Sequence, residues 1–138
     1  MAVPPTRTGG CLCGQVRYTM NADPLMCVTC HCKNCQKQAG SALSIIIGVA
    51  EDSVEITGEV KTYNDTGDSG ATVRRQFCPE CGSPVFTRID APGLMFIKAG
   101  TLDDTSELNP AFHCYGKSKQ DWIPMGDIPI YETVPEGL

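Results

Sequence analysis

The arrangement of its cysteines limits what this chain can fold into more than any other feature. Two pairs lie far apart in the sequence, Cys11 with Cys13 near the start and Cys78 with Cys81 in the second half. The second pair is a CxxC motif followed by Gly82, and glycine allows the positive φ that the tight turn of a zinc knuckle requires. Each pair supplies two sulfur ligands, and zinc prefers four in tetrahedral geometry. The spacing predicts a closed four-sulfur site that joins the two halves of the chain.

A second group of cysteines, Cys30, Cys32 and Cys35, lies within one short segment. Three sulfurs leave one zinc position for another ligand, which is typical of a site that binds or activates something. Cys27 forms a further CxxC with Cys30, so it could act as a fourth ligand and close the site. The alternative is that Cys27 is a small buried hydrophobic residue in a strand. Cys114 is also expected to be buried.

Metal ligands explain these cysteines better than disulfides do. The number of cysteines is odd, at nine, and the first ten residues do not resemble a charged and then apolar signal peptide. In a reducing compartment, clustered cysteines are more often metal ligands than disulfides. No apolar run is long enough to cross a bilayer. We therefore expect a cytoplasmic protein with two zinc ions and no membrane partner, folded as a single domain over residues 1–138.

The charge of the chain argues against nucleic acid as a partner. Zinc knuckles often occur in nucleic-acid-binding proteins, but the formal net charge here is −5. An acidic chain lacks the basic surface that a phosphate backbone attracts.

Short apolar segments with turns between them predict an all-β domain. The expected strands cover residues 14–20, 25–28, 42–49, 54–57, 60–64, 73–77, 85–89 and 94–99. The segment 42–49 contains Ile45-Ile46-Ile47, a continuously apolar β-branched run that is typical of a strand buried on both faces. Gly58 and Glu59 predict a tight connection between two paired strands, and 65–70 a polar loop. A short helix is expected over 33–38, ending at Gly40.

The whole chain resembles one known family on specific motifs. The matching residues are Gly10-Cys11-Leu12-Cys13-Gly14-Gln15-Val16-Arg17-Tyr18, Cys30-His31-Cys32-Lys33-Asn34-Cys35-Gln36-Lys37, Gly40-Ser41-Ala42, Phe77-Cys78-Pro79-Glu80-Cys81-Gly82-Ser83, Leu102-Asp103-Asp104, Pro110, His113 and Trp122. Over about residues 8–125 they are similar to the glutathione-dependent formaldehyde-activating family, which includes the centromere protein V branch. The resemblance implies a coiled antiparallel β-sheet fold, similar to that of methionine-R-sulfoxide reductases, and carbon–sulfur lyase chemistry. It also implies a structural zinc on Cys11, Cys13, Cys78 and Cys81 and a second zinc on Cys30, Cys32 and Cys35, the same sets that spacing predicts.

A thiol is the simplest ligand to complete the second site. Zinc lowers the pKa of a bound thiol, so a glutathione-type substrate would arrive as a thiolate that adds to formaldehyde or leaves from a carbon–sulfur adduct. His31 and His113 are candidate proton donors or acceptors. The alternative for His31 is that it orients the cysteine loop by hydrogen bonding.

Other polar and aromatic residues have two interpretations each. Lys33, Lys37 and Lys119 could bind the carboxylates of a tripeptide or form a solvated face. Trp122 could line the pocket or lie in the core. A different function also remains open for the whole chain, a non-catalytic zinc-stabilised binding module.

Overall fold

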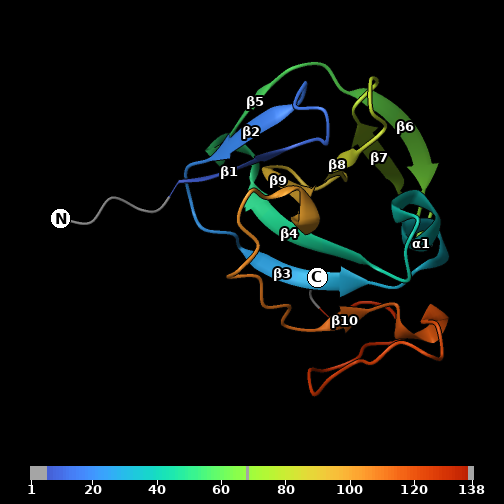
Figure 1. Cartoon of the computed structure of the whole chain (residues 1–138). Coiled ribbons are helices and arrows are strands. Elements are labelled where there is room, and N and C mark those ends of the chain that lie inside the picture. Colours follow the sequence, from blue (N-terminus) through green and yellow to red (C-terminus); the bar gives the residue numbers. More distant parts are fainter. Residues whose placement is uncertain (1–5, 68, 137–138) are drawn as a thin grey trace.

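The computed structural model describes residues 6–67 and 69–136, whose strands form two sheets (Figure 1). The three-stranded sheet has the order β1-β2-β5, with bounds β1 (Arg7–Gly10), β2 (Arg17–Met20) and β5 (Val54–Thr57). The seven-stranded sheet has the order β10-β3-β4-β9-β8-β7-β6, with bounds β10 (His113–Cys114), β3 (Met26–Cys30), β4 (Ser44–Ala50), β9 (Leu94–Lys98), β8 (Pro84–Arg88), β7 (Thr72–Phe77) and β6 (Lys61–Thr66). The predicted all-β class is confirmed. All these pairs are antiparallel except β10 with β3, which is parallel.

Helical structure is short in the described residues. The α-helix α1 (Lys33–Ala39) ends at Gly40, which has a φ of 63° and caps the helix in the left-handed conformation. This confirms the predicted helix and its end. Single 3-10 turns occur at η1 (Glu51–Ser53), η2 (Ala99–Thr101) and η3 (Gly116–Ser118). Within the part of the chain that the structure describes, no helix has the length and apolar character needed to span a membrane.

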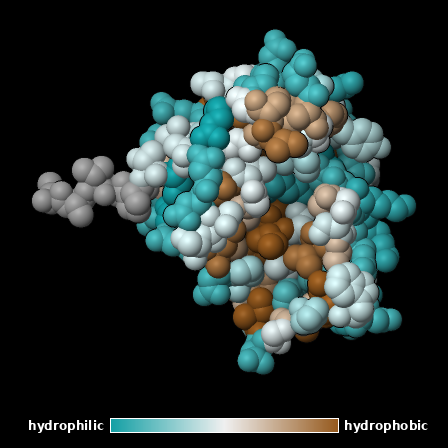
Figure 2. All heavy atoms as spheres, viewed as in Figure 1, coloured by the Kyte–Doolittle hydropathy of each residue, from teal (hydrophilic) through white to brown (hydrophobic). Residues whose placement is uncertain are grey.

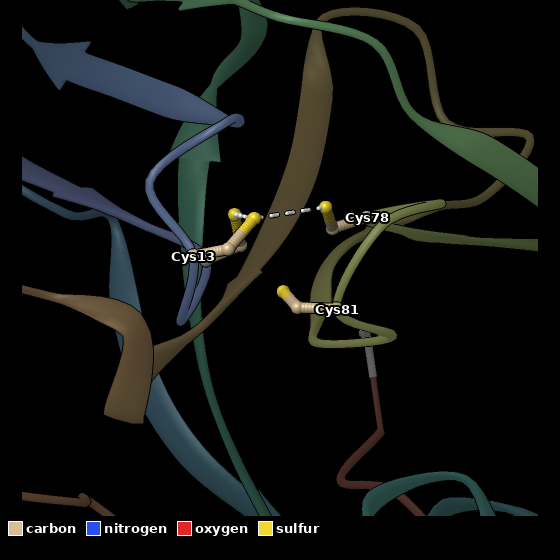
Figure 3. Close-up of side chains that lie close together, drawn as sticks. Cys13, Cys78 and Cys81 are labelled. Carbon is tan, nitrogen blue, oxygen red and sulfur yellow. Dashed lines mark hydrogen bonds between the residues drawn. The ribbon is translucent and has the colours of Figure 1, made fainter.

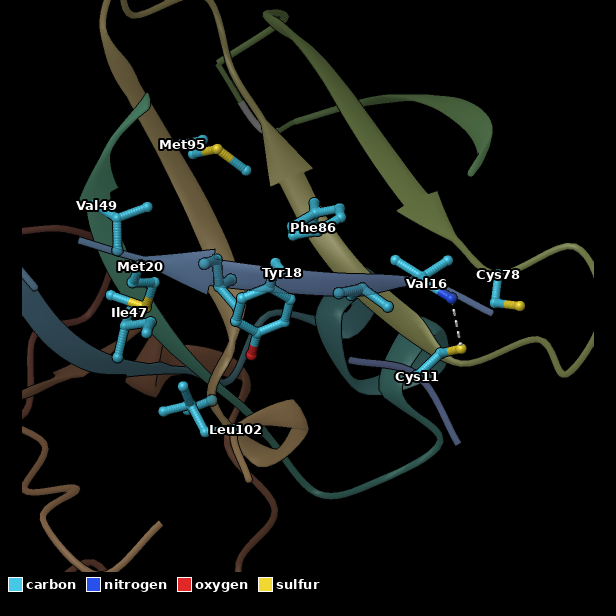
Figure 4. Packing of buried hydrophobic residues seen from close by; sticks show 13 residues of the cluster. Cys11, Val16, Tyr18, Met20, Ile47, Val49, Cys78, Phe86, Met95 and Leu102 are labelled. Atoms are coloured by element: carbon cyan, nitrogen blue, oxygen red, sulfur yellow. Dashed lines mark hydrogen bonds between the residues drawn. The ribbon is translucent and has the colours of Figure 1, made fainter. Parts of the chain in front are cut away.

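The hydrophobic core lies between the two sheets (Figure 4). Tyr18 and Met20 of β2 are buried, as the alternation along that strand predicts. The Tyr18 ring packs edge-to-face on Phe86 of β8, with 5.6 Å between ring centroids. Its hydroxyl forms a 2.7 Å hydrogen bond with Thr101 Oγ1, so the buried polar atom is satisfied. Cys11 and Cys78 belong to the same buried cluster, which places the first cysteine group at the edge of the core.

The two faces of the seven-stranded sheet carry different side chains. Directly paired residues in neighbouring strands point to the same face, and so do residues two apart along a strand. One row of directly paired residues crosses β3, β4, β9 and β8, and all its members pack into the core. The row consists of Cys27, Ile47, Ile97 and Phe86. This face therefore belongs to the interior between the sheets.

The opposite face carries polar and ionisable side chains as well as apolar ones. Cys30 pairs with Ser44, and Lys98 pairs with Ile46, which is two residues beyond Ser44 on β4. Cys30, Ser44 and Lys98 thus share one face. Figure 1 shows the sheet curving so that β6 and β7 approach α1 near the ends of β3 and β4. Figure 2, in the same view, shows hydrophobic side chains in a central recess framed by hydrophilic ones.

Two expectations about the strands were wrong. Gly58 and Glu59 do not form a hairpin, because β5 pairs with β2 in one sheet while β6 pairs with β7 in the other. The connection therefore passes from sheet to sheet. The run Ile45-Ile46-Ile47 is not buried on both faces along its whole length, since Ile45 is 38% exposed near the start of β4. The expected loop 65–70 begins later than predicted, because β6 continues to Thr66; residue 68 lies outside the described residues.

Candidate metal centres

The first cysteine group consists of Cys11, Cys13, Cys78 and Cys81, whose sulfur atoms all lie within 4.8 Å of one another (Figure 3). Cys11 Sγ lies 3.6 Å from Cys13 Sγ, which lies 3.7 Å from Cys78 Sγ. Tetrahedral zinc with bonds of about 2.3 Å requires sulfurs about 3.8 Å apart. The four sulfurs therefore fit a zinc ion, and this group can hold a metal.

Backbone turns direct N–H groups at these sulfurs. Val16 N donates to Cys11 Sγ at 3.2 Å, and Glu80 N donates to Cys78 Sγ at 3.4 Å. Gly82 has a φ of 78°, the positive value that the predicted knuckle needs. The hydroxyl and backbone of Ser83 lower the pKa of Cys81 to about 5. These donors favour thiolates, the form that binds metal.

The second group is the cysteine triad, which we define as Cys30, Cys32 and Cys35. Its three sulfurs also lie within 4.8 Å of one another. Cys30 ends β3, Cys32 is the N-cap of α1, and Cys35 lies in the helix, where its N–H donates to Cys32 Sγ at 3.2 Å. In residues 6–67 and 69–136, no fourth histidine, cysteine or carboxylate joins the group. The triad can therefore hold a metal ion through three protein ligands.

Cys27 and Cys114 lie outside both groups. Cys27 pairs with Ile47 on the core face of the sheet, whereas Cys30 faces the other way, so the strand directs the two sulfurs apart. Cys27 instead lines a cavity of about 420 Å³ that contains no triad residue. The arrangement favours the buried hydrophobic role for Cys27 over that of a fourth ligand. Cys114 is buried, as expected, and pairs with Cys30 through β10.

Two buried cations near the triad had no signal in the sequence. Arg75 is paired with Thr87, which is paired with Phe96, and Phe96 is two residues from Lys98. Arg75 and Lys98 therefore share the sheet face that carries Cys30. Arg75 is 5% exposed and Lys98 7% exposed. Cationic side chains so close to cysteines favour thiolates.

Arg75 connects the triad to β6. Its Nη1 lies 3.9 Å from Cys35 Sγ, and its Nε donates to Asp65 Oδ2 at 2.9 Å. Asp65 also accepts a 3.1 Å hydrogen bond from Asn34 of α1. Burial opposes the charge of Arg75, but the hydrogen bond that Arg75 donates to Asp65 and the nearby Cys35 outweigh it and raise the pKa of Arg75. The guanidinium thus remains charged and holds α1 against β6 and β7.

The electrostatics of the triad favour ionisation at Cys35. Hydrogen bonds from the Cys30 and Cys32 thiols lower the pKa of Cys35 to about 2, and the charges of Lys98 and Arg75 act in the same direction. The pKa of Cys30 is raised by its hydrogen bonds with Cys32 and Cys35 and by burial. One thiolate shared with two thiols is the arrangement expected before a metal displaces the protons.

The candidate histidines, His31 and His113, are buried and contact each other. His31 Nε2 lies 3.2 Å from His113 Nδ1, and His113 Nε2 lies 2.8 Å from the carbonyl oxygen of Met125. Because Nε2 must donate to that carbonyl, His113 Nδ1 is an acceptor, available to His31 or to the Thr29 hydroxyl at 2.5 Å. Gln36 Nε2 donates to the His31 carbonyl oxygen at 2.7 Å. These contacts favour the orienting role for His31; proton transfer by either histidine stays a prediction.

The other candidates are mostly at the surface. Lys33 and Lys37 are exposed on α1, which is consistent with a solvated face. Lys119 is half-buried and near enough for its charge to lower the pKa of His31, although burial contributes more to that shift. Trp122 is 70% exposed, so it does not lie in the core.

We expect all nine cysteines of the native protein to be reduced, with no disulfide, because the sulfurs of each group stand at metal-ligand spacing. Mass spectrometry under denaturing conditions, after rapid alkylation of zinc-replete protein, checks this. Strong reductant should leave the melting temperature unchanged. A bridge between Cys11 and Cys13 or between Cys78 and Cys81 in fresh protein would contradict the metal interpretation.

Comparisons with known proteins agree with the cysteine pattern. A family model described as "Glutathione-dependent formaldehyde-activating enzyme" matches residues 6–118. Relatives from Talaromyces marneffei and Penicillium rubens, both provisionally given that same name, are 30% and 32% identical over 84% and 74% of this chain. The chain spans 65% and 55% of their lengths. A crystal structure of a Rhodobacter sphaeroides protein has a similar fold, with a TM-score of 0.57, 18% identity, and coverage of 90% of this chain and 99% of the other.

Proposed function

Because this chain belongs to the glutathione-dependent formaldehyde-activating enzyme family, we propose that it is a zinc-dependent carbon–sulfur lyase. Its substrate would be a glutathione-type thiol adduct, with S-hydroxymethylglutathione formed or cleaved at the cysteine triad. The observation that carries the proposal is the triad itself, three sulfurs within 4.8 Å of one another with no fourth protein ligand in the described residues. A site built only for stability would be expected to close with four ligands, as the first group does.

The two groups would divide the roles of two zinc ions. Cys11, Cys13, Cys78 and Cys81 would hold a structural ion, and Cys30, Cys32 and Cys35 would hold the second. When bound at the triad, zinc would lower the pKa of a thiol in its fourth position and act as a Lewis acid.

The surrounding residues would hold the triad in shape and supply charge. Arg75, fixed by Asp65, keeps a positive charge 3.9 Å from Cys35 Sγ. His31 and Gln36 connect the cysteine loop to the C-terminal segment through His113 and Ser118. The loop is thereby held on two sides, which favours a fixed ligand geometry.

We expect glutathione to bind as the fourth ligand at the triad. The experiment uses protein in which cobalt replaces zinc at both sites. Adding glutathione should increase the sulfur–cobalt charge-transfer absorption, because the cobalt at the triad gains a fourth sulfur ligand. Activity is measured in parallel by NMR, as faster exchange between free formaldehyde and its glutathione adduct than in buffer.

Cys27→Ala is the matched control, because its sulfur faces the core and not the triad. It should keep both metal ions and the full response to glutathione. If wild-type protein ignores glutathione and Cys27→Ala responds, Cys27 is the fourth ligand and the triad is structural. If neither protein binds thiol or accelerates exchange, the chain is a zinc-stabilised binding module instead.

A further inference from the structure

Lys98 is a buried lysine on the sheet face that carries Cys30. The residue is 7% exposed, and its ammonium donates a 2.7 Å hydrogen bond to Ser44 Oγ. Among residues 6–67 and 69–136, no carboxylate lies within ion-pair distance of it, whereas Arg75 is paired with Asp65. Burying an ammonium without an anion is costly, so such a group is retained where an anion faces it.

The groups near Lys98 that can become anions belong to the triad. Lys98, Ser44 and Cys30 lie on one face of the sheet, in adjacent strands. Burial lowers the pKa of Lys98, while the charges of Cys35, Cys30 and Cys32 oppose that shift. Ser44, itself buried between Cys30 and β9, directs the ammonium toward this end of the sheet.

Charge balance shows what Lys98 contributes when the triad is loaded. Three thiolates around a divalent ion carry one net negative charge, and a fourth thiolate would raise it to two. The Arg75 charge is already matched by Asp65. Among the described residues, Lys98 is a buried cation without a carboxylate partner, so it can offset the charge of an incoming ligand.

We propose that Lys98 is a substrate-binding residue that makes the triad a site for hemithioacetals. Its ammonium group first stabilises the negative charge of the thiolate and then that of the adduct oxygen. This rests on the proposed function. In adduct formation the sulfur electron pair forms the S–C bond, and the π pair of the aldehyde C=O moves to oxygen. The negative charge moves from sulfur to oxygen, which then takes a proton from water. A fixed ammonium beside both atoms stabilises the charge at each stage.

The test compares Lys98→Met, which keeps a long unbranched side chain and removes the charge, with Lys98→Arg, which keeps the charge. Lys61→Met makes the same change at an exposed lysine of β6 and serves as the control. Each variant is loaded with cobalt, and its affinity for glutathione and for 2-mercaptoethanol, which has no carboxylate, is read from the charge-transfer band. Metal content and circular dichroism verify loading and folding, and Lys98→Gln replaces Lys98→Met if the latter does not fold.

We expect Lys98→Met to bind both thiols about tenfold or more weakly, with two metal ions still bound. Lys98→Arg should stay within a few-fold of wild type, and Lys61→Met should not differ from it. Unchanged affinity in Lys98→Met would overturn the role of Lys98 and leave the proposed function intact. A loss confined to glutathione would also overturn it, since the lysine would then hold a carboxylate. No thiol binding in wild type would overturn both proposals.

Discussion

Replacing Cys78 with serine is expected to give insoluble or unfolded protein, the largest effect of any single change considered for this chain. Cys11 and Cys13 follow β1 of the three-stranded sheet, whereas Cys78 and Cys81 lie between β7 and β8 of the seven-stranded sheet. A metal ion on these four sulfurs would fasten one sheet to the other. Structural zinc sites contribute on the order of 10 kcal/mol to folding, which is comparable with the whole stability of a domain of this size.

Soluble yield, zinc content and thermal unfolding measure the effect of Cys78→Ser. Cys27→Ser is the matched control, because Cys27 packs against the same core but belongs to neither cysteine group. The control should remain folded with both metal ions. A soluble Cys78→Ser protein with an unchanged melting temperature would show that the four sulfurs do not hold the fold together.

If the proposed function is correct, replacing Cys35 with serine should remove the proposed second zinc ion and the proposed lyase activity while the fold persists. The triad lies in one short segment at the end of β3 and the start of α1, so losing its metal opens no long loop. The rate of formaldehyde exchange should fall on the order of 100-fold or more, since even outer-shell changes typically cost 10–100-fold. Metal analysis should find one zinc per chain.

Cys114→Ala is the control for that experiment. Cys114 is buried and paired with Cys30, yet it lies outside the triad. It should keep two zinc ions and most of the activity. Full activity in Cys35→Ser would separate the triad from the chemistry, and two zinc ions in that variant would mean that another residue completes the site.

Much of the candidate site could be predicted because its ligands are local in sequence. A CxxC motif or a short cysteine run brings sulfurs together through one turn, so spacing alone divided the cysteines into the two groups that the structure brings together. The helix over α1 was equally local, with Gly40 as its end. The same reasoning could not exclude Cys27, because that required knowing that the strand continues regularly to Cys30.

Arg75 and Lys98 could not be predicted for the opposite reason. They lie on β7 and β9, far in sequence from the triad, and only the order and curvature of the sheet bring them to it. The failed hairpin at Gly58 has a similar cause, since a glycine turn indicates a change of direction but not which sheet receives the next strand. The two-residue strand β10 has no periodicity to detect.

The four-sulfur site of Cys11, Cys13, Cys78 and Cys81 also affects the order in which the chain can fold. The triad closes over six consecutive positions, Cys30 to Cys35, so it can gather a metal while the remaining chain is still a random coil. The four-sulfur site needs Cys11 and Cys81 close together, which requires most strands of both sheets to have paired first. Contacts between such distant positions form slowly. During folding, the triad would therefore bind its metal ion early. The four-sulfur site would bind its metal ion late and would stabilise a topology that has already formed.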